Sequence, residues 1–270
     1  MISDTEISQF VDRFHRDGFL LIEGALTPEQ CTALRSEVDL AMDEYPTPGL
    51  ARWVRSQMFL RGPVFEELLD HPPAFDVAEK LLSFERGDKR VLGGEQMWEG
   101  CQVMNVTSMV SRGESPGDLW HVDDFLLFPR PEGIPWDDRI PFPVFIVSAL
   151  YYLNDLTAEM GPTLVVPGSH KAGYRPDPKA EKPTYEGRGP QTVLARAGDC
   201  LLFHSQLWHR ADGHRCDRPR YVQQVHYGAR FISQRLFPMP NFHMPQDFLL
   251  RLTPRRQRLM GMHACWGQFT

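Results

Sequence analysis

A histidine and an aspartate separated by one residue, His121 and Asp123, are the side chains best suited to chemistry in this 270-residue sequence. On an extended strand, residues i and i+2 point to the same face, so both side chains can contact one ion. An imidazole and a carboxylate form part of the two-His-one-carboxylate triad, which leaves coordination positions open and is diagnostic of oxygen-activating iron(II) sites. By itself the pair does not identify a metal site, because such pairs often occur by chance.

The third ligand must come from elsewhere, and the segment from residue 198 to residue 228 offers four histidines, His204, His209, His214 and His226. Arg220 follows His209 by eleven residues and begins the next apolar strand. A hairpin can therefore return Arg220 towards an ion held by His209. Its planar guanidinium would bind a carboxylate through two hydrogen bonds, although a surface ion pair would also explain it.

Composition bears on several classes of partner and on the compartment. A formal net charge of −6 argues against non-specific binding to nucleic acid or to an anionic membrane. No apolar run reaches the roughly 18 residues of a membrane span, and the N-terminus lacks a secretory signal, so a cytoplasmic protein is expected.

The five cysteines are scattered without a CxxC pair, which disfavours disulfides and a thiolate zinc site. We expect a monomer or homodimer.

The elements that must position these residues change in character near residue 90. Before that point, helical spacing covers Ile7 to Arg16, an apolar strand follows from Gly18 to Gly24, and Thr27 and Pro28 begin a second helix. Residues 1–85 are therefore predicted to be mainly helical. The tail from Pro245 is also predicted to be helical, with the arginines 251, 255, 256 and 258 on a solvated face.

Short apolar runs separated by Gly, Pro and Asp occupy residues 90–235, and they indicate an antiparallel sandwich or barrel. The expected strands are QVMNVTSMV, FPVFIVSALYYL, GPTLVVPG, TVLARAGDCLLFHSQLWHRA and RYVQQVHYGARF. The stretch 171–190 reads as a long loop of the kind that often forms a lid. The sequence thus predicts a single mostly β domain with helices at both ends.

The chain resembles the phytanoyl-CoA dioxygenase family of iron(II)/2-oxoglutarate oxygenases, which includes ectoine hydroxylase. The resemblance rests on four stretches in the family's order: FHRDGFLLIEGALTPEQCTALRSEV, the HxD at His121–Asp123, MGPTLVVPGSHKAG, and His209 followed by Arg220. It implies a double-stranded β-helix, or cupin-like jelly-roll, with Fe(II), 2-oxoglutarate and O2 as cofactors. It also implies that His209, rather than His204, is the third ligand, and that Arg220 binds the distal carboxylate of 2-oxoglutarate.

Two departures from the family pattern concern the surroundings of the metal. The family often has His-Gly-Ser and an Asn five residues after the ligand, whereas this chain has His209-Arg210-Ala211 and His214. The hydrogen bonds around the ligands are therefore expected to differ, because such outer partners orient and tune metal ligands.

Further roles are assigned by position. Thr163 and Gln102 are candidates to bind 2-oxoglutarate, although each could equally satisfy a local backbone group. Alternation along the strand that Arg220 begins places Gln224 and His226 on the same side as Arg220, so both are candidate substrate contacts. Asp124 and Phe125 flank the ligands and are assigned to the same pocket.

The resemblance implies an enzyme that converts 2-oxoglutarate to succinate and CO2 while it oxidises, most simply hydroxylates, an unactivated C–H bond of a small molecule. The carboxylate of Asp123 argues against halogenation, which needs a small residue there. Desaturation, cyclisation and epimerisation stay open, and a natural product or modified amino acid fits better than an acyl-CoA. The rivals are a non-catalytic cupin-like binding protein and a zinc hydrolase, which Arg220 and the lack of an HExxH motif disfavour.

Overall fold

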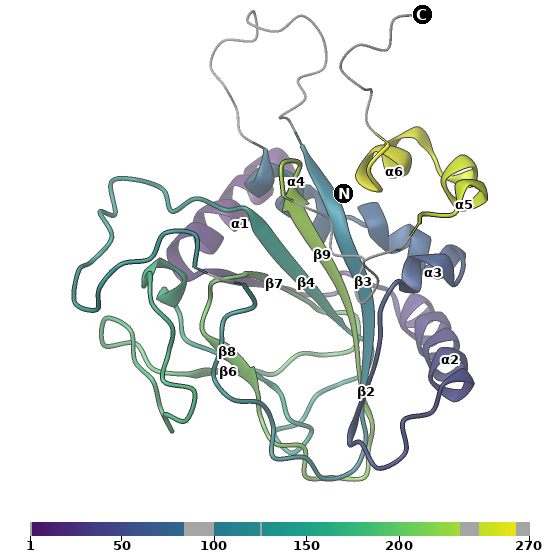
Figure 1. The fold of residues 1–270 in the computed structure, drawn as a ribbon, viewed down its shortest axis with the longest axis horizontal. Coiled ribbons are helices and arrows are strands. Elements are labelled where there is room, and N and C mark those ends of the chain that lie inside the picture. The colour runs from purple at the N-terminus through teal and green to yellow at the C-terminus, as the bar shows by residue number, and fades with distance from the viewer. Residues whose placement is uncertain (1, 84–99, 125, 233–242, 263–270) are drawn as a thin grey trace, which may run out of the picture.

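The computed structural model describes residues 2–83, 100–124, 126–232 and 243–262, and its centre is a pair of antiparallel sheets (Figure 1). The six-stranded sheet has the order β1-β7-β4-β9-β3-β2, and the three-stranded sheet has the order β6-β5-β8. The strands are β1 Phe19–Ile22, β2 Arg52–Arg55, β3 Cys101–Ser111, β4 Ile146–Tyr152, β5 Thr163–Val165, β6 Gln191–Val193, β7 Cys200–His204, β8 His209–Ala211 and β9 Arg220–Ala229. This is the predicted jelly-roll core with flanking helices.

Both helices predicted near the N-terminus are present, and the second begins at Pro28 as predicted, whereas the first begins three residues before the predicted Ile7. Helix α1, Asp4–Asp17, begins with a capping box between Ser3 and Glu6 and ends at Gly18, whose φ of 78° favours glycine. Helix α2, Pro28–Glu44, begins with a second capping box between Thr27 and Gln30. Each box satisfies backbone N–H groups that the first helical turn leaves without a partner.

Both edge strands of the six-stranded sheet come from the N-terminal part of the chain. Strand β1 pairs with β7, and β2 pairs with β3. The sequence predicted β1 but not β2, whose RWVR run lacks an apolar alternation. The six-stranded sheet therefore includes two strands from before residue 90, within the part predicted to be mainly helical.

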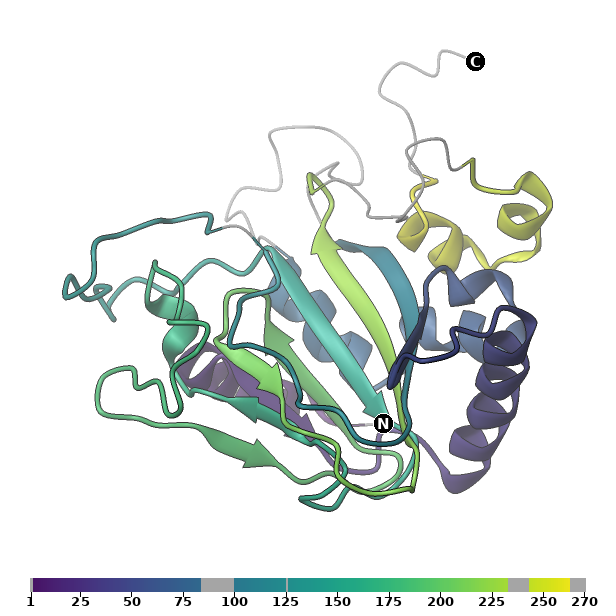
Figure 2. The same ribbon diagram turned by 60° about the horizontal axis from the view of Figure 1, so that its bottom comes forward.

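Helices cover one face of the six-stranded sheet and bury the larger apolar core there (Figure 2). Besides α1 and α2, they are α3 Pro63–Glu66, the 3-10 turns η1 Met58–Leu60 and η2 Glu67–Asp70, and α4 Ala74–Leu82, which was not predicted. In this core the ring of Phe75 from α4 meets that of Tyr227 from β9, with centroids 5.6 Å apart. Burying such a side chain contributes about 1.5–3 kcal/mol, so this layer anchors the sheet.

The opposite face of the large sheet points towards the small sheet. A second apolar cluster lies there, with Leu150 and Tyr152 from β4, Val165 from β5 and Val222 from β9. Since side chains alternate along a strand, the row with Val222 also contains Arg220, Gln224 and His226. Polar side chains of β9 are thereby directed into the space between the sheets.

The loop at 171–190 packs on the outer side of the small sheet. Ala172 and Tyr185 join a cluster with Trp120 and Trp208. These two tryptophans precede His121 and His209, so they point away from those histidines. The indole Nε1 of Trp208 donates a hydrogen bond of 3.1 Å to the carbonyl of Tyr174. The described structure gives this loop a packing role behind the small sheet.

The C-terminal helices α5, Gln246–Arg251, and α6, Pro254–Leu259, dock on the N-terminal helices through ion pairs. Arg251 contacts Glu66 at 2.5 Å, and Arg256 contacts Asp70 at 2.7 Å. Arg251 is exposed, as the predicted solvated face requires, but the sequence did not indicate these ion pairs, because the carboxylate partners lie about 185 residues earlier in the chain. In the described part of the chain, no helix is both long and apolar enough to span a membrane.

Candidate metal centre

The segment that carries His121 and Asp123 lies against the end of β8. His121 and His209 form an antiparallel bridge with two backbone hydrogen bonds of 3.1 Å. Asp123 then leaves the sheet direction and donates its backbone N–H to the carbonyl of Ser205 at 2.9 Å. The strand expected at His121–Asp123 is thus a single bridge followed by a bend.

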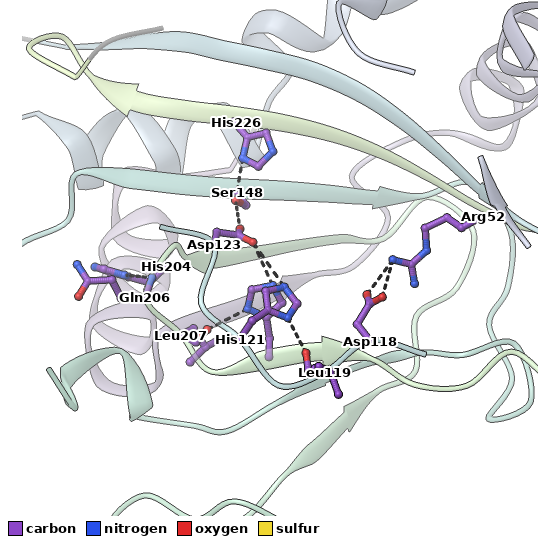
Figure 3. Close-up of polar contacts among 11 residues, drawn as sticks. Arg52, Asp118, Leu119, His121, Asp123, Ser148, His204, Gln206, Leu207 and His226 are labelled. Carbon is purple, nitrogen blue, oxygen red and sulfur yellow. Dashed lines mark hydrogen bonds and ion pairs between the residues drawn. The ribbon is translucent and has the colours of Figure 1, made fainter. Parts of the chain in front are cut away.

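The side chains of His121, Asp123 and His209 converge despite this bend. One ligand atom from each lies within 4.8 Å of the other two. The Asp123 Oδ1 atom is 3.3 Å from Nε2 of His209 and 3.9 Å from Nε2 of His121. The ring centroids of His121 and His209 are 4.3 Å apart, and Figure 3 shows the carboxylate of Asp123 directed towards His121. Two nitrogens and one oxygen so placed match the donor set of the facial triad.

Backbone carbonyls fix which nitrogen each histidine presents. Nδ1 of His121 lies 2.8 Å from the carbonyl of Leu119, and Nδ1 of His209 lies 2.9 Å from that of Leu207. A carbonyl only accepts hydrogen bonds, so each Nδ1 carries the proton. Each neutral ring therefore directs the lone pair of Nε2 towards the shared centre, the arrangement by which proteins orient metal-binding histidines.

A chain of hydrogen bonds holds the carboxylate of Asp123 from behind. Ser148 Oγ donates to Asp123 Oδ2 at 3.3 Å, and Nδ1 of His226 lies 3.0 Å from the same hydroxyl. If Ser148 donates to the carboxylate, Nδ1 of His226 must donate to Ser148. The structure thus gives one nitrogen of His226 an orienting contact, whereas the sequence assigned this residue to the substrate.

Opposite charges within the cluster shift its pKa values. Burial favours neutral Asp123, but the nearby His209 outweighs it and lowers the pKa of Asp123. Burial also opposes a charge on His209, but Asp123 raises the pKa of that imidazole. Burial, followed by repulsion from His209, lowers the pKa of His121. Ionised Asp123 and neutral His121 are the forms that bind a divalent cation.

Arg220 lies farther along β9, with its guanidinium buried. Only 6% of the residue is exposed, and its Nη2 donates a 3.2 Å hydrogen bond to Ser111 Oγ. Among the described residues, no carboxylate forms an ion pair with Arg220, and its Nε is buried without a hydrogen-bond partner. Burial, followed by repulsion from Arg52, lowers the pKa of Arg220 to about 10. A buried cation of this kind is suited to an anionic ligand.

Tyr152 and Thr163 lie near Arg220 at this end of the space between the sheets. Their hydroxyls are 2.9 Å apart, and the charge of Arg220 acts on the phenol of Tyr152. Thr163 was predicted to bind 2-oxoglutarate, and its position beside this arginine fits that role. Burial raises the pKa of Tyr152 to about 12, so the phenol stays a neutral hydrogen-bond donor.

The other residues predicted to contact 2-oxoglutarate or substrate are Gln102, Gln224, Asp124 and Phe125. Gln102 is opposite Gly228 in the β3–β9 register, and its amide donates to the carbonyl of Ile232. Gln224 is half-buried on the inward row of β9, and Asp124 is buried. Phe125 lies outside the described residues. The roles of these four residues stay predictions.

The competing histidines lie elsewhere. His204 points to the helix-covered face, where Nε2 is 3.1 Å from the carbonyl of Pro143 and Nδ1 accepts the backbone N–H of Gln206. The ring of Phe14 from α1 is 6.3 Å away. His214 places Nδ1 2.8 Å from the carbonyl of Gly113. Neither residue belongs to the converging cluster.

Sequence reasoning missed several residues of this region, namely Arg52, Ser111, Asp118, Ser148 and Tyr152. A signal existed for Ser148, the one serine in the otherwise apolar and aromatic run IVSALYY. Alternation along that run also places Tyr152 on the same side as Ser148. The partners of the other three depend on pairing between distant segments.

Known proteins were compared with the chain at the level of family, sequence and fold. The family model for phytanoyl-CoA dioxygenase (PhyH) matches residues 14–222, which is more than half of the chain. The chain belongs to the phytanoyl-CoA dioxygenase family. It is accordingly an iron(II)- and 2-oxoglutarate-dependent dioxygenase, as the resemblance of its motifs predicted.

Curated relatives of this family member match over nearly the whole chain. "Dioxygenase FUM3" of Gibberella moniliformis is 26% identical, with 98% of this chain and 86% of the relative covered. Protein Rv1501 of Mycobacterium tuberculosis is 31% identical, with 97% and 89% covered.

Solved structures share the fold of this family member. The epimerase SnoN, in complex with Fe3+, alpha ketoglutarate and nogalamycin RO, aligns with a TM-score of 0.64 at 19% identity, covering 90% of this chain and 93% of SnoN. HygX from Streptomyces hygroscopicus, with nickel and 2-oxoglutarate bound, aligns with a TM-score of 0.62 at 18% identity, covering 84% and 88%.

Proposed function

We propose that this dioxygenase hydroxylates an unactivated C–H bond of a small, natural-product-like molecule, with iron(II) held by His121, Asp123 and His209. The observation that carries the proposal is the convergence of the two Nε2 atoms and one carboxylate oxygen within 4.8 Å. When bound, iron(II) and 2-oxoglutarate supply the oxidant, and the protein positions both.

The protein's own groups have distinct tasks in this proposal. The carbonyls of Leu119 and Leu207 hold the imidazoles in the tautomer that binds metal, and Ser148 fixes the carboxylate of Asp123. Arg220 receives the distal carboxylate of 2-oxoglutarate, because it is a buried guanidinium without an acidic partner among the described residues. Thr163 and Tyr152 contribute hydroxyl groups beside that carboxylate.

The substrate binds on the side of the metal opposite Arg220, near the end of β9 that carries His226 and Gly228. Gln224 and Nε2 of His226 offer polar contacts there, next to apolar strand residues. SnoN in complex with nogalamycin RO and HygX with hygromycin B bound suggest the chemical class of compounds with which to begin a screen.

The test begins with anaerobic titration of 2-oxoglutarate into the iron-loaded protein, followed by the metal-to-ligand charge-transfer band. A panel of natural products and modified amino acids is then added with O2, and succinate is measured above the uncoupled background. Products whose mass increases by one oxygen are expected.

Other outcomes separate the alternatives. A product that loses two hydrogens, or changes only stereochemistry, would replace hydroxylation by desaturation, cyclisation or epimerisation. Metal binding without succinate formation under any condition would favour a non-catalytic binding protein. Activity that follows bound zinc and needs no 2-oxoglutarate would overturn the proposal in favour of hydrolysis.

A further inference from the structure

A second arginine, Arg52, lies on the same face as Arg220 at the end of the sheet where Arg220 is found. In the strand register Arg52 is opposite Ser111, and Ser111 is opposite Arg220. These residues form one row across β2, β3 and β9, and residues in one row share a face of the sheet. With strands about 4.8 Å apart, the two arginine backbones are separated by about 10 Å.

Asp118 links Arg52 to the segment that carries the metal ligands. Nη1 of Arg52 contacts both carboxylate oxygens of Asp118, at 2.9 Å and 2.8 Å (Figure 3). Asp118 lies three residues before His121, and its backbone N–H donates to the carbonyl of Ala211 at 2.9 Å. The ion pair therefore joins the edge strand of the large sheet to the small sheet.

The pair lies at the more exposed margin of the Arg220 environment. Its side chains are 28% and 33% exposed, whereas Arg220 is 6% exposed. Both charges reach Arg220 electrostatically. After burial, the largest influence on the pKa of Arg220 is repulsion from Arg52, which lowers it, while attraction to Asp118 raises it. The two members of the pair thus act on Arg220 with opposite signs.

We propose that Arg52 and Asp118 are specificity-determining residues that set the charge around Arg220 and thereby the affinity for 2-oxoglutarate. The proposal rests on the proposed role of Arg220. Asp118 is a rival anion for Arg220 and repels a dicarboxylate, and Arg52 neutralises it through the ion pair. With both present, Arg220 supplies one net positive charge for one distal carboxylate.

Single substitutions should therefore change affinity in opposite directions. Arg52→Gln leaves Asp118 without its partner and should weaken 2-oxoglutarate binding about five- to tenfold, an effect typical of one charge several ångströms away near a protein surface. Asp118→Asn leaves Arg52 uncompensated and should strengthen binding by a similar factor of about five. The double variant should return close to wild type, and Arg52→Lys should retain most of the affinity.

The experiment is the anaerobic charge-transfer titration of 2-oxoglutarate, at low and at high salt, with thermal unfolding of each protein without ligand. Matched controls come from the ion pair of Arg61 and Glu44, which has contacts of 2.7 Å and 2.6 Å and whose members are not among the charges that act on Arg220. Arg61→Gln and Glu44→Gln should leave 2-oxoglutarate affinity unchanged. High salt should shrink the opposite shifts of Arg52→Gln and Asp118→Asn.

Two results would overturn the inference. If both single variants weakened 2-oxoglutarate binding, the ion pair would only hold the two sheets together. If neither variant changed the affinity, the ion pair would have no influence on Arg220. Should a single variant fail to fold, Arg52→Lys and the double variant decide, because loss of affinity in either contradicts charge balance. Failure of the wild type itself to bind 2-oxoglutarate would instead refute the proposed function.

Discussion

Buried histidines in the space between the two sheets and on the helix-covered face of the large sheet differ in their hydrogen-bond partners. His204 and His209 lie five residues apart and are both buried. On the helix side, both ring nitrogens of His204 have backbone partners. Between the sheets, only Nδ1 of His209 has a backbone carbonyl, and Nε2 faces Asp123 and His121. A histidine with hydrogen-bond partners at both ring nitrogens has a packing role. A histidine whose Nε2 faces other potential ligands can bind an ion.

The arginines show the same contrast. Arg251 and Arg256 join the terminal helices to the N-terminal helices through Glu66 and Asp70. Arg220 is more deeply buried and forms no ion pair with a described carboxylate. Burying a charge without a partner is costly, so this difference supports the proposal that Arg220 receives an anionic ligand.

The largest effect expected from this contrast concerns the paired histidines. His209→Ala, like His121→Ala and Asp123→Ala, should abolish turnover and strongly weaken iron binding, because each removes a ligand atom. His204→Ala should retain iron and turnover. Iron content after anaerobic reconstitution and succinate formation provide the measurement. Loss of iron in His204→Ala together with its retention in His209→Ala would reverse the assignment.

The next effect distinguishes His204 by its pH dependence. Burial lowers the pKa of His204 from 6.5 to about 4 in the folded protein. As the pH falls, His204 is therefore protonated in the unfolded chain before it is protonated in the folded protein. The free energy of unfolding decreases between about pH 6.5 and about pH 4. The loss reaches about 3 kcal/mol, because each unit of pKa difference corresponds to about 1.4 kcal/mol. His204→Gln should lack this part of the acid sensitivity.

Urea unfolding of the metal-free wild type and His204→Gln at about pH 7 and about pH 4.5 measures that difference. The wild type should lose more unfolding free energy than the variant over this interval. An equal loss in both proteins would show that His204 already titrates normally in the folded state.

A smaller effect compares the unpaired arginine with a paired one. Arg220→Ala should weaken 2-oxoglutarate binding about ten- to hundredfold, because a charged hydrogen bond to a carboxylate is worth about 1.5–3 kcal/mol. Arg220→Lys keeps the charge but loses the planar fork, so its affinity should lie between. Iron affinity should barely change. An unchanged 2-oxoglutarate affinity in the charge-transfer titration of Arg220→Ala would leave Arg210, Arg215, Arg218 and Arg230 to be tested.

The smallest effect belongs to the paired arginine. Arg251→Ala should lower the unfolding free energy by about 1 kcal/mol or less, since the Arg251 side chain is 47% exposed and solvent screens its ion pair. The 2-oxoglutarate affinity should stay that of the wild type. A change in that affinity, with unfolding unaffected, would contradict the division between a structural region and a ligand-binding region.

The sequence by itself determined the local elements and the identity of the main candidate residues. The helix start at Thr27 and the alternation along β9 depend on neighbours a few residues away, so they can be predicted without a structure. The order of four motifs also indicated the family, and with it the set His121, Asp123, His209 and Arg220.

Tertiary structure alone decided which distant groups support those residues. Ser148 contacts His226 across 78 residues of chain, and Arg52 contacts Asp118 across 66. Such pairs depend on the register between strands and on the position of β2 at the edge of the sheet, which local propensity does not specify. The ion pairs of the C-terminal arginines were missed for the same reason, because a charged side chain carries no local mark of a partner about 185 residues away.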